Sequence, residues 1–180
     1  MRLGIADHLG WAAAVTTTAD HQVVDRRRIA LVEPGVPNMP IHHDSKTLDV
    51  AATEALVARV RDSAKRATEA ALDALAASLP APIWSVAIRR WPADFPTEVA
   101  IQRVSPHEAW ADGVMYRQVL AEVARARGWE VRLYDAKTVE AQDIAALGER
   151  ADAVLRGPRA RLGPPLGKDQ RVALAATVVA

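Results

Sequence analysis

The first third of the chain follows the pattern of short β-strands. An apolar run covers residues 3–6, a segment rich in Val, Thr and small residues covers 11–18, and a third segment covers 22–32 around a run of arginines. Short links at 8–10 and 19–21 separate these segments, as the turns of hairpins do. The pattern predicts a meander of three antiparallel strands.

A proline-rich segment and a long helical pattern follow. Residues 33–44 contain three prolines and a glycine, which interrupt regular structure and predict a loop. Across residues 49–79, apolar side chains recur at spacings of three and four, which predicts one long helix with a single apolar face. The members of this stripe are Leu56, Val60, Ala64, Ala67, Ala71, Leu75 and Leu79.

The second half of the chain alternates between strand and helix patterns. We expect strands at 83–88 and 129–134, helices at 105–127, 139–147 and 168–179, and a Pro/Gly-rich loop at 156–167. Ser105, Pro106 and Glu108 have the spacing of a capping box with proline at the first helical position. Gly128 is typical of a helix end. We therefore place a helix between Ser105 and Gly128.

This order of elements predicts an α/β fold. Three antiparallel strands come first, and each later strand is reached through a helix, so it must lie parallel to a neighbour. Right-handed crossovers give a mixed five-stranded sheet with helices on both faces, a three-layer α/β/α architecture. With 180 residues, half of them hydrophobic, the chain has the length of one domain, and we assign residues 1–180 to a single domain.

Composition narrows the classes of function. The chain has 23 Lys and Arg against 22 Asp and Glu, and a net charge of +1 argues against a strongly basic nucleic-acid binder but allows a local basic patch. Without cysteine there are no disulfides or thiolate ligands, so a metal would need His or carboxylate ligands. The usage of Ala, Arg and Val is typical of GC-rich bacterial coding.

The sequence also bears on location. Asp7 interrupts the N-terminal apolar run too early for a signal peptide, and no stretch has the length needed to span a bilayer. We expect a cytoplasmic protein without membrane contacts. The apolar face of the last predicted helix fits either the sheet of its own chain or a second subunit, so the sequence leaves the oligomeric state open.

Two segments carry a resemblance to a known superfamily. Residues 3–10 (LGIADHLG) place an acidic residue in the turn after the first strand, and residues 167–175 (GKDQRVALA) place one at the start of the last helix. Together with the order of elements, these segments resemble the ribonuclease-H-like superfamily, and in particular its Holliday-junction resolvase branch. The resemblance implies a ribonuclease-H-like fold over nearly the whole chain.

The resemblance also implies a chemistry. In that superfamily, carboxylates from separate elements hold two Mg²⁺ or Mn²⁺ ions that promote phosphodiester cleavage. Asp7 and Asp169 match the acids of the first strand and the last helix, and nucleic acid or another phosphate-containing ligand would be the partner. A structural role is open for both residues, because aspartate also caps turns and is favoured at helix N-termini.

The end of the central strand departs from the family pattern. Where the family has an acid, this chain has Arg89 and Arg90, which would repel Mg²⁺ by several kcal/mol at an effective dielectric constant of about 20. These arginines and Lys168 are candidates for phosphate binding, with solvated surface charges as the alternative. Asp169 follows Lys168 where a P-loop requires Ser or Thr, so no P-loop is present.

Two further groups of residues are candidates. In the proline-rich loop, His42 is a candidate metal ligand and His43 a candidate catalytic base, with solvated loop residues as the alternative. The predicted helix at 105–127 carries a third group, His107, Asp112, Tyr116 and Arg117. Asp112 and Tyr116 lie one turn apart, where a phenol can donate to a carboxylate, with a structural hydrogen bond across the sheet as the alternative. The five tryptophans are spread over all elements, which favours core anchors over a base-stacking platform.

These observations leave several functions open. The first is a divalent-metal-dependent nuclease or a phosphate-ligand-binding protein with Asp7, Asp169 and a loop histidine at its site. The second is a non-catalytic binding or assembly module of the same fold, which the arginines of the central strand favour. The third is an actin-like or sugar-kinase-like nucleotide binder, although the Asp7 turn lacks the Gly-rich hairpin that cradles phosphate.

Overall fold

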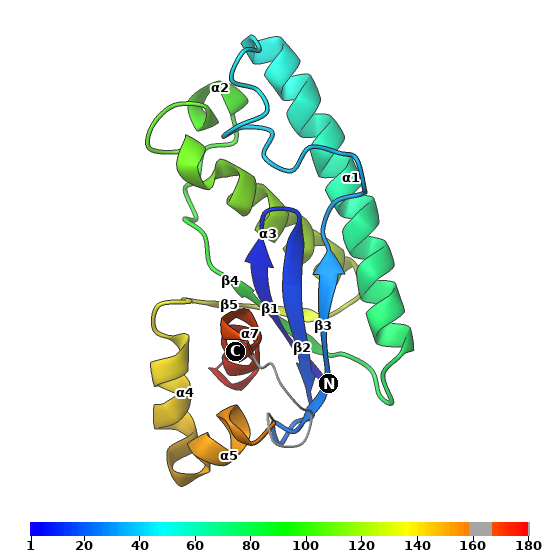
Figure 1. The fold of residues 1–180 in the computed structure, drawn as a ribbon, viewed down its shortest axis with the longest axis vertical. Coiled ribbons are helices and arrows are strands. Elements are labelled where there is room, and N and C mark those ends of the chain that lie inside the picture. The colour runs from blue at the N-terminus through cyan, green and yellow to red at the C-terminus, as the bar shows by residue number, and fades with distance from the viewer. Residues whose placement is uncertain (159–166, 180) are drawn as a thin grey trace.

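Five strands and several helices make up the described part of the chain (Figure 1). A computed structural model describes residues 1–158 and 167–179. The strands are β1 (Arg2–His8), β2 (Trp11–Thr17), β3 (Val23–Ala30), β4 (Ser85–Arg89) and β5 (Glu130–Tyr134). The helices are α1 (Val50–Ala77), α2 (Val99–Gln102), α3 (Glu108–Ala126), α4 (Val139–Leu147), the 3₁₀ turn η1 (Gly148–Arg150), α5 (Ala151–Leu155) and α7 (Lys168–Val179).

The strands form one mixed sheet in the order β3-β2-β1-β4-β5. β1 pairs antiparallel with β2, from Arg2 opposite Thr17 to His8 opposite Trp11, and β2 pairs antiparallel with β3. β4 is parallel to both β1 and β5. The predicted mixed five-stranded sheet, with three antiparallel strands followed by two parallel strands, is therefore confirmed.

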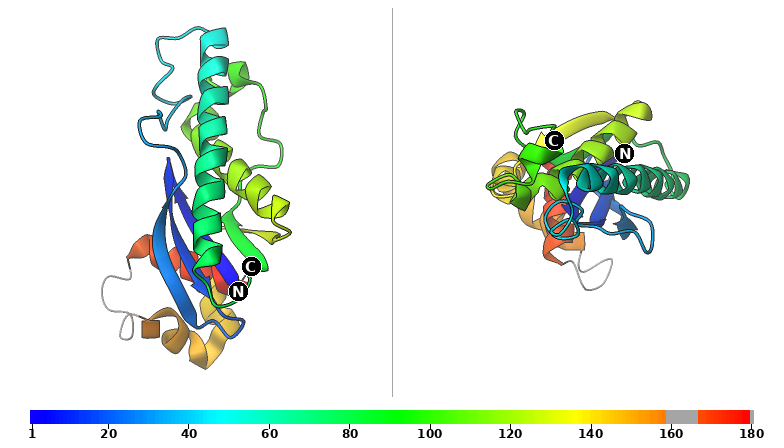
Figure 2. Two further views of the ribbon diagram at one scale, coloured as in Figure 1. Left: turned by 90° about the vertical axis from the view of Figure 1, so that its right-hand side faces the viewer. Right: turned by 90° about the horizontal axis from the view of Figure 1, so that it is seen from above.

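Helices cover both faces of this sheet, which gives the predicted three layers (Figures 1 and 2). Because side chains alternate along a strand, Leu3 and Ile5 of β1 pack with residues of α1 and α3 in the larger core. Ala6 of β1 lies in a second core with residues of α7. Consecutive residues at the end of β1 consequently face different helices.

The proline-rich loop is fastened to α3 by buried polar groups. Asp112 accepts hydrogen bonds from the backbone N–H groups of Ile41 and His42, at 2.9 and 3.0 Å. One turn later, the hydroxyl of Tyr116 donates to the carbonyl oxygen of Asn38 at 3.2 Å. Burial raises the pKa of Asp112, although these N–H donors oppose the shift. The pair has a structural role, but its partner is the loop, so the predicted hydrogen bond across the sheet is wrong.

The start of α3 differs from the sequence prediction. The helix begins at Glu108 with His107 as its N-cap, and no side chain caps it, so the predicted capping box at Ser105 is wrong. The short helix α2 ends just before, and Ser105 and Pro106 belong to the turn between the two helices. In this turn the N–H of His107 donates to the carbonyl of Val104 at 2.9 Å. Local main-chain bonds therefore replace the side-chain cap.

Other predicted boundaries are confirmed with small shifts. Asp49 caps α1 by accepting from the N–H of Ala52 at 2.8 Å, and α4 spans the predicted residues. Gly128 follows α3 with a φ of 73°, which glycine adopts without strain. The short elements α2, η1 and α5 lack a sequence prediction. Part of the predicted loop at 156–167 lies outside the described residues. In the described ranges, no helix is long and apolar enough to cross a bilayer.

A close backbone contact positions α7 on the sheet. A Cβ atom built on Gly4 of β1 would lie only 1.8 Å from the carbonyl oxygen of Ala173 in α7. The helix therefore approaches β1 to a distance that a side chain at this position does not allow.

We expect Gly4→Ala to lower the free energy of unfolding by about 2 kcal/mol or more, because the helix backbone must move away from the strand. At this chain length, such a loss lowers the melting temperature by about 4–8 °C. Gly113→Ala in α3 is the matched control, since its Cβ would meet only the end of the Arg117 side chain at 3.5 Å. Thermal unfolding that shows equal effects for both variants would contradict the close contact.

A buried carboxyl group lies in helix α4. Asp143 of α4 is fully buried, and within the described ranges neither of its oxygens has a hydrogen-bond partner. Burial, assisted by the nearby charge of Glu140, raises the pKa of Asp143 to about 8. The folded protein therefore binds a proton that the unfolded chain releases near its ordinary value of 3.8.

This raised pKa predicts a dependence of stability on pH. Between about pH 4 and pH 8, the unfolded chain is deprotonated at Asp143 while the folded protein keeps the proton, so stability falls as the pH rises. The contribution to the slope is at most about 1.4 kcal/mol per pH unit. Urea unfolding of Asp143→Asn should show a shallower slope than the parent. Asp152→Asn, at an exposed site on α5, should leave the slope unchanged.

Candidate functional site

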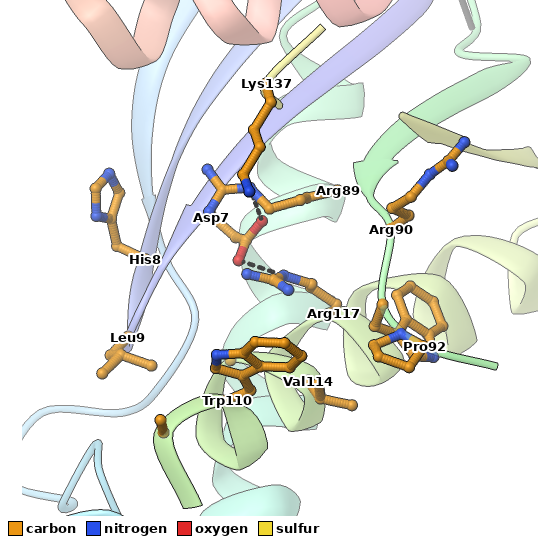
Figure 3. A pocket seen from close by; sticks show the side chains of 13 residues that line it. Asp7, His8, Leu9, Arg89, Arg90, Pro92, Trp110, Val114, Arg117 and Lys137 are labelled. Atoms are coloured by element: carbon orange, nitrogen blue, oxygen red, sulfur yellow. Dashed lines mark hydrogen bonds and ion pairs between the residues drawn. The ribbon is translucent and has the colours of Figure 1, made fainter. Parts of the chain in front are cut away.

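A hollow of about 830 Å³ opens at the carboxyl ends of β1 and β4 (Figure 3). Parallel strands of α/β sheets commonly bind ligands at this edge, where neighbouring connections diverge to opposite faces. β1 contributes Asp7 and His8, the end of β4 contributes residues 89–92, and α3 contributes residues between Ala109 and Arg117. Lys137, which follows β5, completes the lining.

Asp7 lies between two arginines in this hollow (Figure 3). The Nε of Arg117 donates to Oδ2 of Asp7 at 2.8 Å, and the Nε of Arg89 lies 3.8 Å from Oδ1. The side chain of Asp7 is only 2% exposed, against 17% for Arg117 and 33% for Arg89. Burying a carboxylate costs free energy unless such partners compensate for the lost hydration. The two arginines therefore cover Asp7 from solvent and are themselves held at the hollow.

One face of α3 forms a wall of the hollow. Trp110, Val114 and Arg117 are spaced by four and three residues, so they follow one another along the same side of the helix. Gly113 lies on this face too, and a Cβ there would lie 3.5 Å from the guanidinium of Arg117. Trp110 is 59% exposed, which departs from the prediction that the tryptophans are core anchors.

The end of β4 provides two arginines with different directions. Arg89 reaches Asp7, whereas Arg90 also lines the hollow but its guanidinium points away from Asp7 (Figure 3). Lys137 extends into the hollow from the segment after β5. Four cationic side chains and one carboxylate thus line the hollow, which gives it a positive charge.

Asp169 lies next to His8 and not next to Asp7. His8 points away from Asp7, and its Nε2 lies 3.0 Å from Oδ2 of Asp169 at the start of α7. The imidazole stacks on Trp11, with ring centroids 4.1 Å apart, and Arg28 lies over the same indole at 3.9 Å. Asp169 therefore joins a stack that ties α7 to the β1–β2 hairpin.

The remaining predicted site residues lie outside the hollow. His42 and His43 are exposed in the proline-rich loop, where His43 pairs with Asp44 at 3.2 Å. Lys168 is exposed at the first residue of α7. None of these residues is among those that line the hollow. Of the predicted site residues, the structure brings together Asp7, Arg89 and Arg90.

Solved structures with the same architecture are known, although the sequence itself gives no match. No family model matches the chain, and no match was found among curated proteins. Thermus thermophilus RuvC in complex with a Holliday junction substrate superposes with a TM-score of 0.53 and 16% identity, covering 98% of this chain and 89% of that one. A second RuvC structure from the same organism gives a TM-score of 0.47 and 18% identity, covering 98% and 90%.

The chain has the ribonuclease-H-like fold. This assignment confirms the resemblance seen in the sequence at the level of the fold. The strand order, the mix of parallel and antiparallel pairs and the helices on both faces all agree with it.

The two-metal site implied by the ribonuclease-H-like resemblance does not fit these residues. Among the described residues, no group of three or more His, Cys, Asp or Glu side chains could hold a metal ion. The segment 159–166 and Ala180, which are not described, contain no such residue in the sequence. A metal at Asp7 would also have to displace Arg117 from a buried carboxylate. The charges at this site favour an anion instead.

The sequence did not indicate Trp110 or Lys137 as site residues, and it did not predict that Arg117 contacts Asp7. The spacing of Trp110, Val114 and Arg117 on one helix face was a usable signal, because it combines an aromatic and a cationic side chain. Nothing in the local sequence links that face to β1, since the two segments are about a hundred residues apart.

We expect Arg117→Met to lower the free energy of unfolding by about 3 kcal/mol, because it leaves the carboxylate of Asp7 buried without its nearest partner. The double variant Asp7→Asn/Arg117→Met should recover at least half of that loss. Urea unfolding of both single variants and the double variant measures this coupling.

Arg89→Met is the matched control for this cycle. Its Nε is farther from Asp7 and its side chain is more exposed, so its loss should be smaller than that of Arg117→Met. Strictly additive losses in the double variant would show that the pair of Asp7 and Arg117 is not energetically coupled.

Proposed function

We propose that this protein binds nucleic acid through the cationic hollow and does not cleave it by a two-metal route. The observation that carries the proposal is the convergence of Arg89, Arg117 and Lys137 around a carboxylate that is already neutralised. Guanidinium and ammonium groups are the usual protein ligands of phosphate oxygens.

The position of the cations supports this proposal. They come from α3, from the end of β4 and from the segment after β5, so three separate segments contribute positive charge to one concave surface. The chain as a whole carries a net charge of only +1, so this local excess is not a consequence of a basic composition. A local patch of this kind attracts phosphates and makes binding dependent on salt.

The fold adds a second line of support. The ribonuclease-H-like structure with a TM-score of 0.53 is described as a complex with a Holliday junction substrate. Its fold therefore accommodates nucleic acid in at least one protein of similar architecture. The present chain would use the same scaffold with arginines at the end of β4 and with Asp7 paired to Arg117.

In this proposal Asp7 is a positioning residue. Its buried carboxylate accepts from Arg117 and attracts Arg89, which limits the rotamers of both guanidinium groups. Because these rotamers are already limited before binding, the arginines lose less conformational entropy when a phosphate binds. The acid that resembles the metal ligand of the superfamily would therefore serve to hold cations.

The proposal is tested with fluorescently labelled oligonucleotides, single-stranded and duplex, in buffer that contains EDTA. Fluorescence anisotropy should detect binding without metal. We expect Arg89→Gln and Lys137→Gln each to weaken binding about tenfold at low salt, since each removes a charged partner of a phosphate. Each substitution should also reduce the salt dependence of log K by about one unit.

The control variant is Arg156→Gln, which changes an exposed arginine near α5 that pairs with Asp152. It removes the same charge far from the hollow and should bind as the parent does. Parallel incubations with Mg²⁺ or Mn²⁺ should leave the oligonucleotides intact. Metal-dependent cleavage that Asp7→Asn abolishes would overturn the proposal in favour of a nuclease, and absence of any binding would overturn nucleic-acid recognition.

A further inference from the structure

Trp110 is the exposed aromatic residue at the mouth of the hollow. Its side chain is 59% exposed, and along the described ranges no ring stack or cation–π contact involves it. By contrast, Trp11 stacks on His8 and the ring of Trp84 lies under Arg2. A free indole at the opening of a cationic hollow leaves a large apolar surface in contact with water.

The indole and the cations lie along one wall. Trp110 and Arg117 are two helical turns apart on the same face of α3, which places their Cα atoms about 10 Å apart along the helix axis, and the guanidinium of Arg117 lies near Gly113 between them. Gly113 and Val114 lie between them and keep the wall free of long side chains. Figure 3 shows the indole below Arg117, with Lys137 and Arg89 beyond it. One end of the hollow is thus aromatic and the other is positively charged.

We propose that Trp110 stacks on an unpaired base of a nucleic-acid strand whose adjacent phosphate is bound by Arg89, Arg117 and Lys137. This inference rests on the proposed function and names the part of the nucleic acid that the site recognises. The volume of about 830 Å³ lies in the range of pockets that hold small organic ligands, and one nucleotide fits that range. In a duplex both faces of a base are covered by its neighbours, so the indole selects single-stranded segments.

The chemistry recognised is that of a nucleoside phosphate, which also occurs as a free nucleotide. A strand offers additional phosphates to Arg90 at the rim of the hollow, whereas a mononucleotide has only one phosphate group. We therefore expect the strand to bind more tightly than the free nucleotide.

The deciding experiment compares ligands with identical phosphates. An oligothymidylate of about 15 nucleotides is compared with an abasic strand of the same length and with a duplex. Base stacking by an aromatic side chain should make the oligothymidylate bind about five- to a hundredfold more tightly than the abasic strand. Anisotropy gives the affinities, and quenching of tryptophan fluorescence reports contact with an indole.

Substitutions at Trp110 test whether its indole causes the difference in affinity between the oligothymidylate and the abasic strand. Trp110→Ala should reduce binding of the oligothymidylate to the level of the abasic strand and leave the abasic strand unaffected. Trp110→Phe should retain most of the preference and lose the part of the fluorescence quenching that comes from Trp110, while Trp91, which also lines the hollow, remains. Trp84→Ala removes another exposed tryptophan, at the amino end of β4, and should behave as the parent does.

The outcomes separate this inference from the proposed function. If the abasic strand and the oligothymidylate bind equally in parent and Trp110→Ala, phosphate binding stands and base stacking is overturned. If neither strand binds, nucleic-acid recognition fails and the inference falls with it. Thymidine monophosphate should displace the labelled strand only at much higher concentration than unlabelled strand does. Displacement at equal concentration would overturn a strand as the ligand.

Discussion

The pairing of Asp7 with Arg117 is the interaction on which the candidate site depends. It joins the end of β1 to the middle of α3 through a carboxylate that is almost completely buried. An unpaired charge at this depth costs several kcal/mol, so the pair fixes both side chains and the helix that carries Arg117. The same contact places the face of α3 that bears Trp110 at the carboxyl edge of the sheet.

The alternation of side chains along β1 explains why the two acids of the sequence pattern have different partners. Asp7 faces the side of the sheet where α3 packs, and His8 faces the side where α7 packs, where it meets Asp169. A ribonuclease-H-like fold is therefore combined here with a distribution of charge that suits an anion. Fold and chemistry are separate properties, and the residues at the site decide the chemistry.

The polar contacts of α3 show how one helix serves both the fold and the site. Asp112 and Tyr116 hold the proline-rich loop, while Trp110 and Arg117 line the hollow. Because different residues of α3 hold the loop and line the hollow, His42 and His43 lie away from Asp7. The backbone of the loop is bound to Asp112, and the two imidazoles remain on the exposed side of that loop.

The sequence by itself determined the order of the strands and of the longer helices, the mixed sheet and most ends of these elements, because periodicity, proline and glycine act over a few residues. Gly128 as the terminator of α3 is such a local signal. The sequence prediction failed at Ser105, because the turn after α2 provides main-chain hydrogen bonds in place of the predicted side-chain cap. Only the tertiary structure decided that Arg117 neutralises Asp7 and that Trp110 stays exposed. Those outcomes depend on burial and on contacts between distant segments, which local pattern does not encode.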